Sequence, residues 1–512
     1  MRRFTESFGR RGRWPIPLLA LLVTTLAYFS YVHGYWNPPH LFWDENYHIA
    51  SAQRYLNGTF FMEPHPPLGK LFIALGEFIV SPEANGAADQ FVATDHAPET
   101  PVGFSFVGYR LFPTLFAWLI VPMLFSIFLL LTKSQVLAAL LTVPYLFDNA
   151  MIVHSRSAML EPTLEFFAVA MILLFLLLLK WRTDRGRVGL YSLLFGACFA
   201  AVLTTKVNGL VMGVLYLPLL WKLFQVGDSR RTIRDTLAFS ALGFLLVFVG
   251  VWHTHFALAS NINRSLPGEG YYQASDEYKG ILGAGENASI VHFPVMLRDS
   301  MAFVAHYQRG VPKLDLCKSG EDGSPWFFWP IGARAINYRW ETPGGGDTAP
   351  YRYLYLQSNP AGWFFGFLGV VMAGMLVVGS LVVGWRLPLK NRFMLTVFLG
   401  LWVAYMAAIS QLDRVMYLYH YFIPLLFSYI LFGLAFSEIG QIGSWKMTDH
   451  RRMMALALCA VAVFGSYCFY RPLTYYEPIT DAEFQKRSLI RLWDLHCARC
   501  DLTSPLTRGT CS

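Results

Sequence analysis

Charged side chains are scarce in this sequence: Asp, Glu, Lys and Arg together make up 14% of its 512 residues. A soluble globular protein is about a quarter charged. Cysteine is also rare, and seven cysteines in so long a chain exclude a small disulfide-stabilised scaffold. Hydrophobic residues make up 55% and aromatic residues 16% of the chain. These proportions exclude a disordered chain and a coiled coil, and they indicate a polytopic membrane protein.

The formal net charge of +8 permits two interpretations. A basic chain can bind nucleic acid, whereas in a membrane protein an excess of Lys and Arg commonly marks the cytoplasmic loops. The distribution of the charges along the chain decides between them.

The apolar runs predict about eleven transmembrane helices, since a span needs about 20 apolar residues. The run over 188–222 is too long for one span, and Lys206 interrupts it, so we divide it there. The predicted spans are 15–33, 106–131, 135–153, 157–180, 188–204, 206–222, 236–257, 361–384, 393–411, 415–437 and 452–470.

Basic residues cluster between alternate pairs of these spans. The clusters are Arg2 to Arg13 in the tail 1–14, Lys180 to Arg187, Lys222 to Arg234, Arg386 to Arg392 and Lys446 to Arg452. With eleven spans all of them lie on one face, which the positive-inside rule makes the cytoplasm. Merging the divided pair would put the later clusters on the wrong side. The net charge is therefore interpreted as a topology signal.

The opposite face holds the long segments. They are the loop 34–105 inside an N-terminal transmembrane module (15–257), the loop 258–360 and the tail 471–512 that follows the C-terminal helices (361–470). Loops of this length are usually functional, so we look for chemistry there. Four cysteines, Cys317, Cys497, Cys500 and Cys511, fall on this face. We expect structural disulfides among them, and the sequence leaves their pairing open.

Two adjacent carboxylates, Asp44 and Glu45, follow the first span and precede a short helical pattern that ends at Asn57-Gly58. Asp44 stands where a helix N-cap would, so one interpretation is purely structural. The other is functional, because carboxylates close to a bilayer are costly and usually serve a site. Neighbouring helical residues do not share a face, so the two carboxylates should have different roles.

Further polar groups lie at the outer ends of the spans. His65 belongs to a proline-rich elbow that leads into a short amphipathic stretch over 70–80, which we expect to lie in the membrane interface. Arg156, Lys206, Arg414 and His420 supply potential cations. Each alone could be an interface anchor. Four potential cations beside one carboxylate pair predict a site for an anionic lipid headgroup.

Nine motifs, in order over residues 41 to 476, resemble those of the protein O-mannosyltransferase family. They are Trp43-Asp44-Glu45; Gly58 to Met62 leading to His65-Pro66-Pro67-Leu68-Gly69-Lys70; Ser155-Arg156 with Leu160-Glu161; Lys206-Val207-Asn208-Gly209; His255 to Leu258 leading to Pro267-Gly268-Glu269; Pro325 to Pro330; Asn359 to Trp363; Arg414 to Pro424; and Arg471 to Tyr475. The chain departs from the family at three places. Asn46-Tyr47-His48 replaces Val-His-Phe, Glu161 replaces Asp, and Asn208 stands where the family has an aromatic residue.

The resemblance implies an all-α membrane enzyme of the GT-C glycosyltransferase fold. Its reaction would move mannose, with inversion, from polyprenyl-phosphate-mannose to Ser or Thr hydroxyls of exported proteins. The loop 258–360 has no room for the MIR module of eukaryotic members, which points to a bacterial protein of the inner membrane. The N-terminus would be cytoplasmic, and the site and the C-terminus periplasmic.

The chemistry of that reaction suggests residue roles. A lipid phosphate is a good leaving group, with a second pKa of about 6, so one general base suffices. Asp44 is our candidate base, and Glu45 and His65 are candidates for binding the acceptor. The donor phosphate would be held by Arg156, Lys206, Arg414 and His420. We expect no metal and no cofactor, because no cluster has metal-ligand spacing.

Two rival functions remain open from the sequence. A related GT-C transferase could modify lipid A or a cell-wall glycan with the same kind of donor, since fold alone does not choose an acceptor. A transporter of lipid-linked sugar would need ionisable groups at mid-span, whereas here they lie mainly at the outer ends of the spans.

Overall fold

The computed structural model describes residues 16–80, 96–97, 99–225, 229–264, 267–318, 320–342, 349–382 and 389–499. Within these ranges, nine helices are long and apolar enough to cross a membrane, and a bent helix pair forms one more span. A shorter apolar helix, Pro17–Val32, occupies the first expected span. All eleven positions expected from the apolar runs are therefore helical, which confirms a polytopic all-α protein.

The spanning elements follow one another as the apolar runs predict. They are α1 (Ile16–Ala27) with the π-helical turn Tyr28–Val32, α5 (Leu111–Thr132), α6 (Gln135–Leu146) with α7 (Asn149–Ser155), α8 (Glu161–Lys180), α9 (Arg185–Leu203), the 3₁₀ helix Val207–Leu215 with α10 (Tyr216–Phe224), α11 (Ser229–Leu258), α15 (Pro360–Val382), α16 (Arg392–Ile409), α17 (Phe422–Glu438) after the 3₁₀ turn Leu418–Tyr421, and α18 (Asp449–Thr474). Lys206 lies at the break between α9 and the 3₁₀ helix, as expected.

The third span is broken by a bend of 65° between α6 and α7. Pro144 lies in the last turn of α6, where it cannot donate a backbone hydrogen bond. Asp148 then restarts the helix, because its carboxylate accepts a hydrogen bond from the backbone N–H of Met151 at 3.0 Å. The bend carries α7 and the residues after it toward the outer face.

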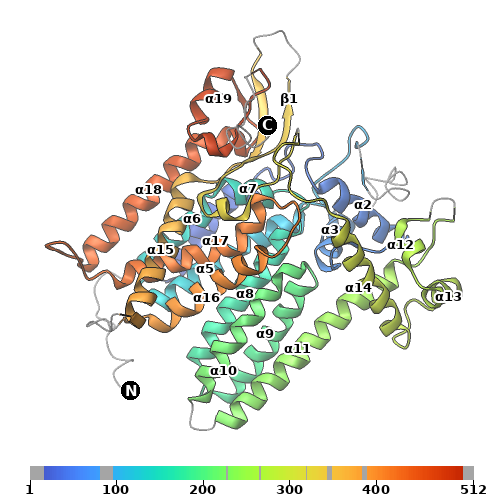
Figure 1. Ribbon diagram of the computed structural model, residues 1–512, viewed down its shortest axis with the longest axis horizontal. Helices are drawn as coiled ribbons and strands as arrows, with labels where there is room; N and C mark the ends of the chain where they lie inside the picture. Colours follow the sequence, from blue (N-terminus) through green and yellow to red (C-terminus); the bar gives the residue numbers. More distant parts are fainter. Residues whose placement is uncertain are drawn as a thin grey trace.

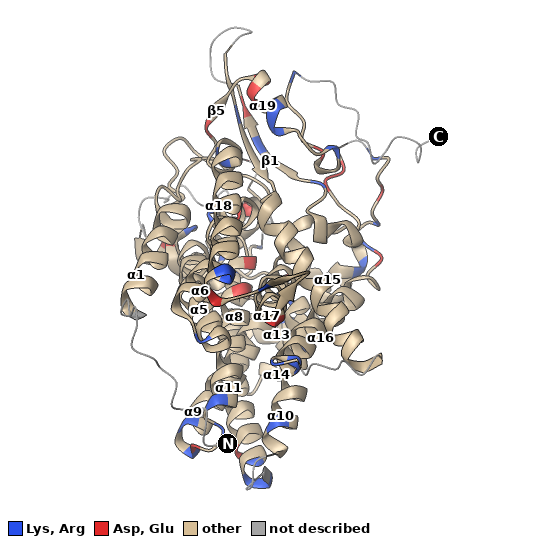
Figure 2. Ribbon diagram, turned by 90° about the vertical axis from the view of Figure 1, so that its left-hand side faces the viewer, with Lys and Arg blue, Asp and Glu red and all other residues tan. Residues whose placement is uncertain are grey.

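Close helix contacts depend on glycine. A Cβ added to Gly196 of α9 would lie 1.9 Å from the carbonyl oxygen of Ser240 in α11. The two helices therefore run side by side along one flank of the molecule, with α10 and α8 beside them (Figure 1). The Lys and Arg residues of α9, α10 and α11 gather at the end of these helices that lies away from β1 (Figure 2).

The opposite end carries the elements outside the spans. They are α2 (Glu45–Leu56), α3 (Leu68–Val80), α12 (Glu269–Gln273), α13 (Asp276–Ala284), α14 (Phe293–Gly310), the 3₁₀ helix Trp326–Ile331, β1 (Ile336–Glu341), β2 (Tyr351–Leu356), β5 (Pro478–Ile479), α19 (Asp481–Arg487) and the 3₁₀ turn Arg491–Trp493. The hairpin of β3 (Gln441–Ile442) and β4 (Trp445–Lys446) connects α17 to α18.

A three-stranded sheet in the order β1-β2-β5 joins the large loop to the C-terminal tail. Both β1 and β5 pair antiparallel with β2. Beneath it, Tyr353 and Tyr355 pack with Phe484, Trp493 and Cys497. Cys317 and Cys497 each belong to a disulfide, which confirms that disulfides form on this face, while Cys500 and Cys511 lie outside the described residues. The large loop and the tail thus form one folded unit.

Candidate active site

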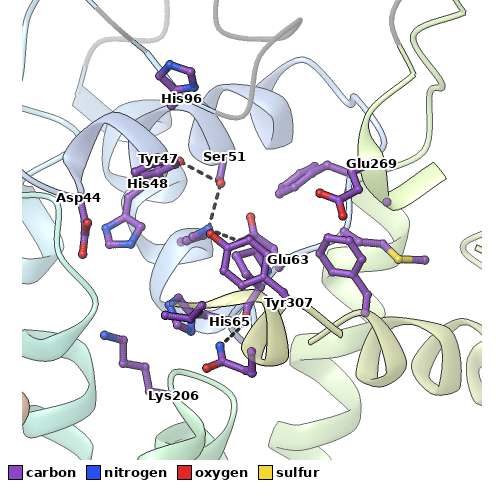
Figure 3. Close-up of a pocket in the computed structure, with 18 of the residues that line it drawn as sticks. Asp44, Tyr47, His48, Ser51, Glu63, His65, His96, Lys206, Glu269 and Tyr307 are labelled. Carbon is purple, nitrogen blue, oxygen red and sulfur yellow. Dashed lines mark hydrogen bonds and ion pairs between the residues drawn. The ribbon is translucent and has the colours of Figure 1, made fainter. Parts of the chain in front are cut away.

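A cavity of about 560 Å³ opens where three outer segments meet. The first loop, with α2 and the elbow before α3, forms one wall (Figure 3). The lobe of α12 to α14 forms a second wall, and the segment from Arg414 to His420 forms a third. The ionisable side chains lining it are Asp44, Tyr47, His48, Arg54, Glu63, His65, Lys70, His96, Lys206, Glu269, Tyr271, Tyr307, Arg414, Tyr417, Tyr419 and His420.

Asp44 immediately precedes α2 but does not cap it, because its side chain makes no capping hydrogen bond. The carboxylate instead accepts a hydrogen bond from the Tyr419 hydroxyl, with 3.3 Å between Oδ2 and the phenol oxygen. The preceding Trp43 adopts a φ of +54°, a left-handed conformation that costs a bulky residue energy. Burial raises the pKa of Asp44. The sequence left the structural and functional interpretations open, and this geometry favours the functional one.

Glu45 points away from the cavity and is fully buried. Both carboxylate oxygens bind the guanidinium of Arg110, at 2.7 and 2.8 Å, and Oε1 also accepts the backbone N–H of Ala158 at 2.8 Å. Arg110 donates further to the carbonyls of Trp36, Pro38 and His40. The acceptor-binding role expected for Glu45 is not supported by this placement. Through Arg110, Glu45 instead holds the first loop in place.

A buried chain of polar contacts supports the wall opposite α2. Lys206 donates to Oε1 of Glu161, and Oε2 of Glu161 lies 2.8 Å from Nε2 of His154. The other nitrogen of His154 lies 2.6 Å from the hydroxyl of Tyr338. The imidazole stacks on Tyr419, with ring centroids 4.8 Å apart. This chain fixes Lys206 beside Asp44, so the cavity brings together the expected base and one expected cation.

Arg156 does not reach the cavity, contrary to the role expected for it. Its guanidinium donates to the carbonyls of Ser30, Tyr31 and His33 through Nη1, and to that of Gly34 at 2.6 Å through Nη2. It also covers the ring of Tyr475 at 4.8 Å. Burial lowers its pKa to about 10, so it stays charged at neutral pH. Arg156 satisfies the carbonyls at the C-terminal end of the first helix, where a cation is favoured.

Arg414 and His420 do line the cavity. The Arg414 guanidinium is half-buried and donates to Oε1 of Gln308 in α14. Burial lowers the pKa of Arg414. His420 packs parallel to Trp329, and its Nδ1 lies 3.1 Å from the carbonyl of Tyr417. Three of the four residues expected to bind the donor phosphate therefore share the cavity with Asp44.

The proline-rich elbow brings His65 into the cavity wall. The backbone N–H of Leu68 donates to the carbonyl of Thr204 at 2.8 Å, and a Cβ on Gly69 would lie 2.7 Å from Leu160. Burial and the nearby Lys206 and Lys70 hold the pKa of His65 well below its usual range, so the ring is neutral. Beyond the elbow, α3 exposes Leu75, Phe78 and Ile79, as an interfacial helix would.

Four residues of the site were absent from the sequence-based candidates. His48 follows Asp44 by one helical turn, a spacing that puts both on one face. Glu63 and Lys70 form a buried ion pair in the cavity wall. Tyr419 lies in a run of tyrosines that resembles an ordinary interfacial belt. The spacing could have identified His48, but no local signal distinguishes Tyr419 from its neighbours.

Two family models match this chain. The model described as dolichyl-phosphate-mannose-protein mannosyltransferase matches residues 21–261, and that of the C-terminal four-helix transmembrane region of protein O-mannosyltransferase matches residues 313–493. Together they cover well over half of the chain. The chain belongs to the protein O-mannosyltransferase family. The first match includes Asp44, His65 and Lys206, and the second includes Arg414 and His420.

Curated members of the family have related sequences. Protein O-mannosyl-transferase 2 of Danio rerio is 27% identical over 303 residues, which are 56% of this chain and 38% of that protein. Dolichyl-phosphate-mannose–protein mannosyltransferase 3 of Saccharomyces cerevisiae is 26% identical over 258 residues, or 48% of this chain and 33% of that protein. The matched segments thus span less than half of these relatives.

A solved structure shares the fold. The S. cerevisiae protein O-mannosyltransferase Pmt1-Pmt2 complex bound to the sugar donor superposes with a TM-score of 0.76 at 15% identity. The superposition covers 94% of this chain and 93% of the matched chain. The expected GT-C fold is therefore confirmed.

Proposed function

We propose that this protein is an inverting transferase that moves mannose from polyprenyl-phosphate-mannose to Ser or Thr hydroxyls of exported proteins. The observation that carries the proposal is that Asp44 and Lys206 line one cavity, in a chain of this family. The cavity offers a carboxylate to a hydroxyl and, beside it, cations to a phosphate. Membership of the family supports mannose as the sugar and a protein as the acceptor.

The reaction needs one bond made and one broken. The acceptor oxygen attacks C1 of the sugar from the face opposite the phosphate, and the hydroxyl proton passes to the carboxylate of Asp44. The C1–O bond to the phosphate breaks, and its electron pair leaves on the phosphate oxygen. A single displacement inverts C1. The raised pKa of Asp44 makes it a better proton acceptor than an ordinary aspartate.

The leaving phosphate needs positive charge rather than a general acid. Lys206, Arg414 and His420 line the cavity and are proposed to bind it. Arg156 is withdrawn from this set, because its donors are used by backbone carbonyls. His65 remains our candidate for contact with the acceptor, since it lies in the elbow wall between α2 and α3. Neither step calls for a metal or a cofactor.

The membrane orientation is part of the proposal. The basic ends of α9, α10 and α11 would face the cytoplasm of a bacterial cell, and the cavity would open on the periplasmic side of the inner membrane (Figure 2). Such a site can reach only proteins that have been exported.

The test is to incubate the purified protein with polyprenyl-phosphate-mannose and a Ser/Thr-rich peptide, with and without EDTA. We expect the peptide to gain the mass of one hexose, in the anomeric configuration opposite to that of the donor, equally in both conditions. Lipid A is offered in a parallel reaction. Transfer to lipid A alone would overturn the protein acceptor, retention of configuration would overturn the single displacement, and loss of transfer in EDTA would overturn metal independence.

A further inference from the structure

His48 is the cavity residue whose chemistry is most closely defined by its contacts. It lies in α2 one turn after Asp44, and its backbone N–H donates to the carbonyl of Asp44 at 3.1 Å. Its side-chain Nδ1 lies 2.7 Å from the carbonyl oxygen of Ala158. A carbonyl can only accept a hydrogen bond, so Nδ1 must carry the hydrogen.

The ring carries no second hydrogen. Burial, with Lys70 and Lys206 nearby, lowers the pKa of His48 to about 3, so the imidazole is neutral at physiological pH. In a neutral imidazole with hydrogen on Nδ1, the other nitrogen is an acceptor. No described side chain or backbone group donates to Nε2. His48 thus offers an unused acceptor in the cavity wall.

The position of this acceptor indicates what it can bind. The imidazole lies beside the carboxylate of Asp44, above the ammonium of Lys206 (Figure 3). The transferred sugar would be bonded to a phosphate at Lys206 and attacked by the acceptor next to Asp44. It would therefore lie against this wall. Further along the same wall, the buried carboxylate of Glu63 accepts a hydrogen bond from the ammonium of Lys70. Nε2 of His48 is therefore an acceptor that this part of the wall offers to a ligand.

A ligand that matches this acceptor must bring a hydroxyl hydrogen to it. The acceptor Ser or Thr has one hydroxyl hydrogen, and that hydrogen goes to Asp44. The transferred hexose has several hydroxyls left to donate. We propose that Nε2 of His48 accepts a hydrogen bond from a hydroxyl of the transferred hexose, and so helps to select the sugar. The proposal rests on the proposed function. It uses a histidine at a position where this chain departs from the family pattern.

Two substitutions of His48 distinguish the role of Nδ1 as a donor from the role of Nε2 as an acceptor. In His48→Asn, the side-chain amide can still donate to Ala158 but the acceptor at Nε2 is lost. In His48→Gln, the longer side chain can present its oxygen near the position of Nε2. Each variant and the wild type is assayed with polyprenyl-phosphate-mannose and with its 2-, 3-, 4- and 6-deoxy analogues. His292→Asn is the control, because His292 pairs with Glu286 outside the cavity.

We expect one deoxy donor to lower kcat/KM of the wild type about tenfold, as a lost hydrogen bond of ordinary strength would. His48→Asn should show a similar loss with the full donor and no further loss with that deoxy donor. His48→Gln and the His292→Asn control should keep the discrimination. If His48→Asn discriminates among all donors as the wild type does, the proposal is overturned.

Measurements of donor binding test the role of His48 independently of the proposed function. Binding of polyprenyl-phosphate-mannose and of its deoxy analogues is measured alongside turnover, with the acceptor peptide absent. A wild type that transfers nothing contradicts the proposed function, whereas the coupling between His48 and one hydroxyl still appears in the dissociation constants. Binding that is equally strong for all the analogues in every variant would refute the role of His48 even if transfer is observed.

Discussion

The two neighbouring carboxylates at the start of α2 have different surroundings, because consecutive helical residues point about 100° apart. Asp44 faces the cavity, and among the described residues its carboxylate binds the phenol hydroxyl of Tyr419, while Glu45 faces the protein and holds Arg110 and the backbone of Ala158. Glu45 thereby fixes the end of the helix from which Asp44 and His48 project. One carboxylate is placed for chemistry and the other holds it in place.

The raised pKa of Asp44 has a consequence for the pH dependence of the proposed reaction. A general base works only when deprotonated, so the rate falls as the pH drops through the pKa of Asp44. We expect the acid limb of kcat/KM to lie at a higher pH than the value near 4 of an ordinary aspartate. A pH profile of peptide mannosylation measures this, with Glu286→Gln as an exposed control. A rate that stays flat down to pH 4 would contradict a base with a raised pKa.

Arg156 and Lys206 should respond differently to substitution by Gln. Arg156→Gln removes donors from several carbonyls, so the melting temperature should fall while KM for the donor stays near wild type. Lys206→Gln removes a cation from the cavity and should lower kcat/KM for the donor at least tenfold. Thermal unfolding and donor titration of both variants check this. A selective rise in donor KM for Arg156→Gln would restore its phosphate-binding role.

Among the elements, the lobe of α12 to α14 is joined to the first loop by a very close contact. A Cβ added to Gly270 of α12 would lie 2.7 Å from Cβ and 2.8 Å from the backbone nitrogen of Met62. This contact sets how far the lobe wall, with Glu269 and Tyr271, stands from the elbow wall. No other residue than glycine fits there without moving one of the walls.

Gly270→Ala should therefore widen the cavity and raise KM for the acceptor peptide several-fold, with a smaller effect on the donor. Gly283→Ala is the matched control, because nothing lies within 4 Å of a Cβ added there. Steady-state kinetics with each substrate varied in turn measures the difference. Equal effects of the two substitutions would show that the contact with Met62 does not shape the cavity.

Helices could be predicted from the sequence because apolar runs and helix ends are local features. The stop at Asn57-Gly58 and the break at Lys206 were located in this way, and both are confirmed. The site was predicted only in part. Asp44, Lys206, Arg414, His420 and His65 do line one cavity. Glu45 and Arg156 carry the same local signals, but their partners are more than 60 residues away in the chain, so their burial could not be foreseen.

At the scale of the whole molecule, the sheet shows how distant segments are fixed on one face. Strand β2 of the large loop pairs with β5 of the tail after α18, and Cys497 of the tail packs with Tyr353 and Tyr355 of β2. The large loop and the tail must therefore lie on the same side of any membrane. That requirement agrees with the even number of spans, four, that the topology from the charge pattern places between the large loop and the tail.

This topology predicts the accessibility of single cysteines introduced into a variant that lacks Cys198, Cys459 and Cys468. A cysteine at Trp340, in β1, should react with a membrane-impermeant maleimide added to intact cells. One at Trp445, in the β3–β4 hairpin, should react only after lysis. Both side chains are more than half exposed, so burial does not limit the reaction. Labelling of both positions in intact cells would contradict the orientation.

We propose that a single base, Asp44, activates the acceptor in a cavity whose cations hold the donor phosphate. Single-turnover transfer of mannose to a Ser/Thr peptide by Asp44→Asn, with donor binding measured on the same preparation, tests it most directly. We expect the transfer rate to fall by about a hundredfold or more, with a donor dissociation constant within a few-fold of the wild-type value. Transfer by Asp44→Asn at a rate close to that of the wild type would contradict it.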